Sequence, residues 1–69
     1  MTNTNELVRI IKKTGFKMGY IAESLELSRS ALWKKINNKS EFTQSQIYKL
    51  CNMLAISDKQ AKDIFFHNR

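Results

Sequence analysis

The fold is decided by residues 18–36, which read Met18-Gly-Tyr-Ile-Ala-Glu-Ser-Leu25, then Glu26-Leu27-Ser28, then Arg29-Ser-Ala-Leu-Trp-Lys-Lys-Ile36. The first part contains an apolar stripe with the i, i+3, i+4, i+7 spacing of an amphipathic helix, formed by Met18, Ile21, Ala22 and Leu25. In the last part, Leu32 and Ile36 stand one helical turn apart, and most other positions are polar or basic. The pattern predicts two short helices joined by a tight turn at residues 26–28.

The second of these predicted helices has an outer face that is poorly suited to burial. At about 100° per residue, Ser30, Lys34 and Asn37 point away from the side that carries Leu32, and Trp33 lies on the shoulder between the two faces. A basic face that can also form hydrogen bonds is suited to the major groove of DNA.

The same stretch resembles the helix-turn-helix of the Cro and repressor proteins of temperate phages, the lambda-repressor-like domains. Its residues at the family's apolar, small and capping positions are Ile21-Ala22, Leu25, Leu27-Ser28 and Leu32. The resemblance implies that the second helix enters the major groove, and that Ser28 caps it by accepting a hydrogen bond from the amide of Ser30 or Ala31. The family usually has glycine where this chain has Glu26, and a left-handed glutamate costs roughly 1 kcal/mol relative to glycine.

A helix from about Thr4 to Lys13 is predicted before this stretch. Asn3 and Glu6 have the spacing of a helix cap and its reciprocal partner, and Gly15 is expected to end the helix. The expected inward stripe consists of Leu7, Ile10, Ile11 and Thr14, and Phe16 is expected to cover the end of the core.

Two more helices are predicted after it, each behind a capping box. The boxes are Thr43-Gln-Ser-Gln46 and Ser57-Asp-Lys-Gln60. The inward stripes that follow them are Ile47, Leu50, Cys51 and Leu54 in the first helix, and Ala61, Ile64 and Phe65 in the second. Phe42 is expected to staple against Ile47, and residues 67–69 are expected to fray.

Length and composition indicate a single domain over residues 1–69, an all-α bundle of about five short helices. The chain has no proline and only two glycines, which favours helices joined by short turns. No apolar run approaches the roughly 18 residues of a membrane span, and the polar start shows no signal peptide. One cysteine cannot form an internal disulfide, so we expect a reducing cytoplasm, that of a bacterial host.

The net charge of +6 is concentrated where the helix-turn-helix is expected. Residues 1–39 hold eight Lys and Arg against three acids, whereas residues 40–69 hold four against three. A basic half beside a nearly neutral one suits contact with phosphates. A generically basic protein surface is the alternative interpretation of the same charge.

An enzyme is the weakest interpretation of this sequence. The chain has no glycine-rich phosphate loop and no paired carboxylates. His67 has no partner residues at metal-ligand spacing, and Cys51 is most simply a small core residue. We therefore expect neither a cofactor, a metal nor a small-molecule substrate.

Candidate DNA-binding residues follow from the resemblance and from residue chemistry. Those expected to contact bases or groove walls are Arg29, Ser30, Trp33 and Lys34; those expected to contact phosphates are Lys17, Ser28, Asn38, Lys39 and Gln44. Arg29 could bond bidentately to guanine, and Lys34 could reach guanine acceptors or a phosphate. Trp33 is either a contact to thymine methyls and sugars or a lid over the edge of the core. The loop at residues 37–40 is either a backbone contact or a plain surface turn.

The sequence thus predicts a sequence-specific transcriptional regulator that binds an operator in double-stranded DNA, in the form of a homodimer on a two-fold site. The alternative is a small phage regulator that acts by protein contact with a partner repressor. Phe66 lies about 100° from Phe65 on an ideal helix and is expected to face solvent. It is either the anchor of a self or partner interface or a cap on the core.

Overall fold

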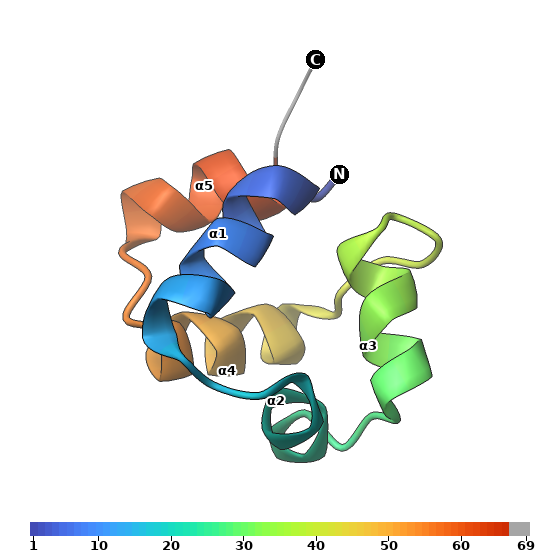
Figure 1. The fold of residues 1–69 in the computed structure, drawn as a ribbon. Coiled ribbons are helices and arrows are strands. Elements are labelled where there is room, and N and C mark those ends of the chain that lie inside the picture. The colour runs from blue at the N-terminus through green and yellow to red at the C-terminus, as the bar shows by residue number, and fades with distance from the viewer. Residues whose placement is uncertain (67–69) are drawn as a thin grey trace.

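The computed structural model describes residues 1–66, which form five α-helices and no strand (Figure 1). The helices are α1 (Thr4–Thr14), α2 (Met18–Ser24), α3 (Arg29–Ile36), α4 (Gln44–Leu54) and α5 (Asp58–Phe65). The predicted all-α bundle is confirmed. The fraying expected at residues 67–69 lies outside the described residues. Within the described range, no helix has both the length and the apolarity needed to cross a membrane.

Helix α1 is the centre of the bundle, because it contacts α3, α4 and α5, while α2 packs on α3 and α4 packs on α5. Helix α3 and the loop after it lie at one edge, opposite α5 (Figure 1). All five helices and three of the connecting segments contribute to one core, whose buried apolar residues are Leu7, Ile10, Ile11, Ile21, Ala22, Leu25, Leu32, Ile36, Phe42, Leu50, Leu54, Ile56, Ile64 and Phe65.

Side-chain caps start four of the five helices, as the sequence predicted. Both capping boxes form: Thr43 and Gln46 bond reciprocally, and so do Ser57 and Gln60. At α1 only half of the expected reciprocal pair forms. Asn3 accepts from the amide of Glu6 at 3.3 Å, but the amide of Asn3 donates to the carbonyl of Ile64 at 2.6 Å, and the Glu6 carboxylate binds Arg9 instead.

Two expectations about the core, those for Thr14 and Phe16, need correction. Thr14 is exposed rather than inward, and its hydroxyl donates to the carbonyl of Ile11 at 2.7 Å. Phe42 packs edge-to-face on Phe65 of α5, with ring centroids 5.7 Å apart, a contact that the sequence did not indicate; the expected staple of Phe42 against Ile47 stays a prediction. Phe16 is 37% exposed and pairs with Tyr20 instead of closing the core.

Left-handed residues end most of the helices. Gly15 ends α1 with φ 80°, and three residues with side chains have positive φ, namely Glu26 (58°), Asn38 (64°) and Ala55 (54°). After α2, the amides of Glu26 and Leu27 bond back to the carbonyls of Glu23 and Ala22, the double closure called a Schellman motif. The left-handed conformation considered for Glu26 is confirmed, and it carries the steric cost expected of a side chain there.

Replacing Glu26 by glycine should therefore stabilise the fold. We expect Glu26→Gly to raise the free energy of unfolding by about 0.5–1 kcal/mol, since relief of the left-handed strain outweighs the added freedom of the unfolded chain. The contact between Glu26 and Lys49 is 3.8 Å long and exposed, so its loss costs little. Ala55→Gly is the matched control without a charge change. Thermal and urea melts measure the stability of both variants. A clear loss of stability in either variant would contradict backbone strain at the substituted position.

Cys51 lies on α4 and packs against the core. Burial raises the pKa of its thiol above the ordinary value, and the nearby Asp58 carboxylate raises it further. Both causes disfavour the thiolate, which is the nucleophilic form. The expected core role of Cys51 agrees with this position.

We expect iodoacetamide to alkylate Cys51 at pH 8 far more slowly in the folded protein than in urea, because the folded thiol is both protonated and shielded. The folded pKa is the higher one, so the thiol's contribution to stability is present below its unfolded pKa and is lost as pH rises through the folded pKa. Cys51→Ala should remove that part of the pH dependence. Equal alkylation rates in both states would place Cys51 outside the core.

Candidate nucleic-acid interface

Helix α3 buries two side chains and exposes most of the others. Leu32 and Ile36 are both 0% exposed. The residues on the other faces are open to solvent: Arg29, Ser30, Trp33 and Lys34, followed by Asn37 at the helix end. The residues predicted to contact bases thus lie together on one uncovered helix.

The start of α3 is fixed by Ser28, which accepts a hydrogen bond from the amide of Ala31 at 3.0 Å, as predicted. The hydroxyl hydrogen of a serine in this role can still be donated outward. Arg29 extends beside the first turn of α2: a Cβ added at Gly19 would lie 3.8 Å from the Arg29 Cδ atom. Lys17, exposed at the cap of α2, therefore stands at the same end of the molecule as the start of α3.

Two neighbouring lysines at the end of α3 have different roles. The Lys35 ammonium group donates to the carbonyl of Glu41 at 2.7 Å, which ties the helix to the loop that follows. Lys34 is exposed on the outer face. Of the two, Lys34 is the cation positioned for contact with a ligand across that face.

Trp33 is 42% exposed, so part of its ring is covered by the protein and part is open. Its carbonyl accepts bonds from the amide of Asn37 and, at 2.8 Å, from the Asn37 side chain. Both interpretations of Trp33, a contact residue and a lid at the edge of the core, are compatible with this half-covered position.

The Asn38 side chain, expected at a phosphate, has partners within the protein. Its amide oxygen accepts from the backbone N–H of Thr2 at 2.8 Å, and its amide nitrogen donates to the Thr2 carbonyl at 2.9 Å. The side chain thus binds within the protein. Lys39 and Gln44 are both exposed, Lys39 just after α3 and Gln44 as the first residue of α4.

Sequence reasoning missed an exposed aromatic pair beside α2. The rings of Phe16 and Tyr20 lie 5.4 Å apart, and Tyr20 is 55% exposed. The signal was available, because Tyr20 lies off the apolar stripe formed by Met18, Ile21 and Ala22. This pair flanks Lys17 on the surface where phosphate contact was predicted.

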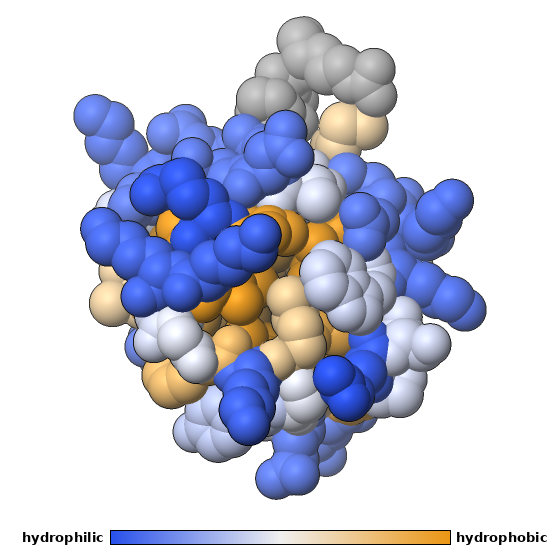
Figure 2. Space-filling model, viewed as in Figure 1, coloured by the Kyte–Doolittle hydropathy of each residue, from blue (hydrophilic) through white to orange (hydrophobic). Residues whose placement is uncertain are grey.

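The segment that contains α3 carries positive charge and no negative charge. Residues 27–40 contain four Lys and Arg and no acid. Hydrophilic side chains ring the face seen in Figure 2, and apolar side chains show through in its centre. A surface with this local excess of positive charge attracts polyanions.

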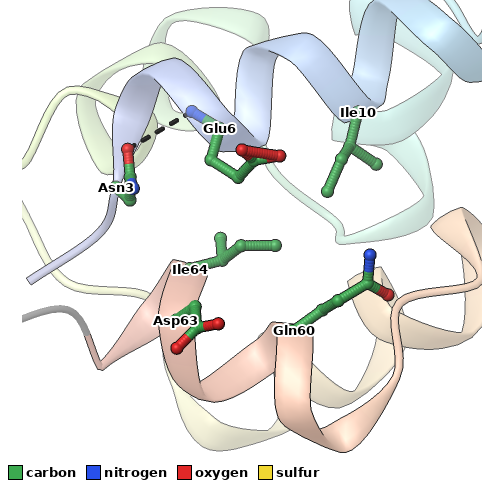
Figure 3. Close-up of a pocket in the computed structure, with 6 residues that line it drawn as sticks. All are labelled: Asn3, Glu6, Ile10, Gln60, Asp63 and Ile64. Carbon is green, nitrogen blue, oxygen red and sulfur yellow. Dashed lines mark hydrogen bonds between the residues drawn. The ribbon is translucent and has the colours of Figure 1, made fainter.

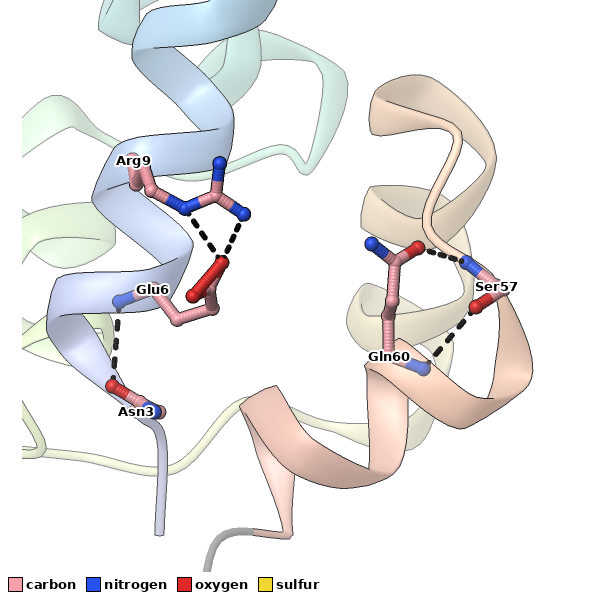
Figure 4. A network of polar contacts seen from close by, with 5 residues as sticks. All are labelled: Asn3, Glu6, Arg9, Ser57 and Gln60. Atoms are coloured by element: carbon pink, nitrogen blue, oxygen red, sulfur yellow. Dashed lines mark hydrogen bonds and ion pairs between the residues drawn. The ribbon is translucent and has the colours of Figure 1, made fainter.

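A shallow groove of about 260 Å³ lies between α1 and α5, away from α3. Ile10 and Ile64 form its floor and point toward each other across it (Figure 3). Most of the polar groups around it take part in local structure: Asn3 caps α1, Glu6 binds Arg9, and Gln60 pairs with Ser57 (Figure 4). Among residues 1–66, no three potential metal ligands gather in one place.

Phe66 follows α5 and is 60% exposed. Its predicted orientation toward solvent is confirmed, and this exposure argues against a role as a cap on the core. Its amide donates to the carbonyl of Lys62 at 3.1 Å, which fixes the backbone while the ring projects outward. Tyr48 on α4 is another well-exposed ring, at 70%.

Comparison with known proteins adds no assignment of function. No family model, no curated protein and no solved structure matches this chain. The surface around α3 is therefore the basis on which a function can be assigned.

Proposed function

We propose that this protein is a sequence-specific DNA-binding transcriptional regulator that reads the major groove with α3. The observation that carries the proposal is the asymmetry of α3: two fully buried anchors on one side, and basic and hydrogen-bonding residues exposed on the other. The resemblance to the helix-turn-helix of Cro and repressor proteins supports the same interpretation, with α2 as the first helix of the motif.

The dimensions of α3 are compatible with the groove. An eight-residue helix is about 12 Å long and, with side chains, about 10–12 Å wide. The major groove of B-form DNA is about 12 Å wide. Because α3 lies at the edge of the bundle (Figure 1), no other helix of the described chain stands between its outer face and a duplex.

Each outer residue has a chemistry that suits base edges. The Arg29 guanidinium can donate two bonds to guanine, and Lys34 can donate to guanine acceptors. Ser30 can donate or accept, and the exposed part of the Trp33 ring can pack on a thymine methyl group. Base contacts of this kind carry sequence preference, whereas phosphate contacts do not.

Phosphate contacts are assigned to the residues around α3. Lys17 and Lys39 provide charge at the two ends of the reading surface, and the Ser28 hydroxyl and Gln44 side chain provide neutral donors. Asn38 is not included, because its side chain binds Thr2. Tyr20 is added as a residue that can pack against the sugar-phosphate backbone beside Lys17.

A second candidate function is favoured by the exposure of Phe66. An exposed aromatic ring can anchor a protein contact, either with a second copy of this chain or with a partner repressor. In the first case the protein binds a two-fold operator as a homodimer in the bacterial cytoplasm. In the second case it is a modulator whose DNA binding requires the partner.

Arg29 and Lys39 should respond differently to alanine substitution. With a duplex selected from a randomised pool, Arg29→Ala should weaken binding by about 1–3 kcal/mol and relax preference at one base pair. Lys39→Ala should weaken binding to all duplexes alike and reduce the salt slope by about one. Fluorescence of Trp33, the one tryptophan in the chain, and gel shifts measure both variants.

Lys59, exposed on α5, supplies the matched control, and Lys59→Ala should change neither the sequence preference nor the salt slope appreciably. If Arg29→Ala and Lys39→Ala behave alike across sequences, the division into base and phosphate contacts is wrong. If the unmodified protein selects no sequence without a partner repressor, the modulator function is favoured.

Phe66→Ser should separate association from folding. Since the ring is 60% exposed, we expect nearly unchanged melting but weaker self-association or partner binding, and with it weaker operator binding. Analytical ultracentrifugation and thermal melts measure the two effects. Tyr48→Ser, at another exposed ring, is the control. A large loss of stability with unchanged association would place Phe66 in the core.

A further inference from the structure

Residues 2–4, here called the strap, cross the end of α3. Thr2 is only 7% exposed although it is polar and precedes the first helix. Its backbone N–H and carbonyl both bond to the side chain of Asn38, thirty-six positions away in sequence. In Figure 1 the start of the chain lies between the end of α5 and the loop after α3.

The strap also completes the hydrogen bonding of α3. The last four carbonyls of a helix have no partner within the helix. Three of these carbonyls, those of residues 33–35, accept from the amides of residues 37–39, just beyond the helix. The fourth, on Ile36, accepts from the Thr4 hydroxyl at 2.5 Å, so the end of α3 depends on a residue of α1.

Asn38 can bind Thr2 because of its backbone conformation. With φ 64° it is the left-handed residue of the Schellman motif that ends α3. Asparagine tolerates this conformation better than most residues with side chains. The same residue therefore turns the chain, directs Lys39 into the loop and binds the strap.

The middle residue of the strap, Asn3, is attached to α5. The amide of Asn3 donates to the carbonyl of Ile64 at 2.6 Å, and Ile64 itself is 1% exposed. The strap thus connects the end of α3 to a buried part of the bundle on the opposite side of α1. The loop that begins at Asn38 is therefore tied through the strap to the core of the bundle, so it loses little further freedom when it binds a ligand.

We infer that the strap is a positioning element for the DNA-reading surface, with Thr4 and Asn38 as the positioning residues. It sets the end of α3 and the path of the loop through Lys39, without itself contacting DNA. This inference rests on the proposed function. Ordering a loop upon binding costs affinity, and a loop that is already ordered avoids that cost.

Two substitutions with matched controls test the strap. Asn38→Gly keeps a residue suited to positive φ but removes both bonds to Thr2, and Ala55→Gly places glycine at an equivalent left-handed position far from α3. Thr4→Val removes the hydroxyl bonded to Ile36, and Thr14→Val removes a similar hydroxyl bonded to the carbonyl of Ile11. All four are measured in the full chain.

We expect amide hydrogen exchange at residues 37–39 to be about tenfold faster in Asn38→Gly and in Thr4→Val than in their controls, since the structure holding those amides is loosened. Affinity for the selected duplex should fall by about tenfold in the same two variants. The controls should retain wild-type affinity, and far-UV circular dichroism should show all four variants folded.

Each contrary result has a defined meaning. Unchanged exchange in both strap variants overturns the inference, and so does faster exchange with unchanged affinity. Weaker binding in Asn38→Gly alone, with Thr4→Val like wild type, would make Asn38 a direct contact and also overturns it. If the wild-type protein selects no duplex, the proposed function fails, while the exchange experiment still decides whether the strap holds α3.

Discussion

The structure depends on the way in which a short helix is held by only two buried side chains. Leu32 and Ile36 are the whole contribution of α3 to the buried core. Isolated helices of eight residues do not persist in water, and two anchors fix the helix axis poorly at its ends. Hydrogen bonds therefore fix the two ends of α3, which the two buried side chains leave poorly fixed. Ser28 fixes the start, and the end is fixed by a Schellman motif, the Thr4 hydroxyl and the lysine bond to the Glu41 carbonyl.

This arrangement explains why a residue with a side chain, Asn38, occupies the left-handed position after α3. Glycine at residue 38 would remove backbone strain, but it could not bind Thr2. Glu26 has no comparable set of bonds, since its one described ion pair is 3.8 Å long and exposed. Residues 26 and 38 thus have the same left-handed conformation but different surroundings. At residue 38 the side-chain bonds to Thr2 offset the backbone strain, and Glu26 has no equivalent bonds.

Local features of the sequence were sufficient to predict the helices. The bounds of α3, both capping boxes and the Ser28 cap follow from residues within four positions of one another, where capping chemistry acts. The all-α bundle followed from apolar spacing. In the candidate site, the exposure of Ser30, Lys34 and Asn37 also followed from that spacing, because the positions of Leu32 and Ile36 define the opposite face.

Long-range hydrogen bonds could not be predicted in the same way. Asn38 looked like a turn residue with a free amide, and only the folded chain brings Thr2 to it. The expected bond from Glu6 to the Asn3 amide failed for a similar reason, since that amide reaches Ile64 in another helix. Neither pairing has a local pattern, because each joins segments that lie far apart in the sequence.

The division of α3 into buried and exposed faces has a consequence for how such a surface can change. Arg29, Ser30 and Lys34 contribute little to the core, so substitutions there can alter the proposed DNA-reading surface at small cost in stability. Leu32 and Ile36 allow no such freedom. Asn38 belongs neither with the exposed residues nor with the buried anchors. It is exposed to solvent, yet its side chain is bonded to Thr2, thirty-six positions away in sequence. A change at Asn38 therefore alters both the helix end and the surface presented by the loop, and this couples the geometry of the proposed recognition surface to the packing of α1 and α5.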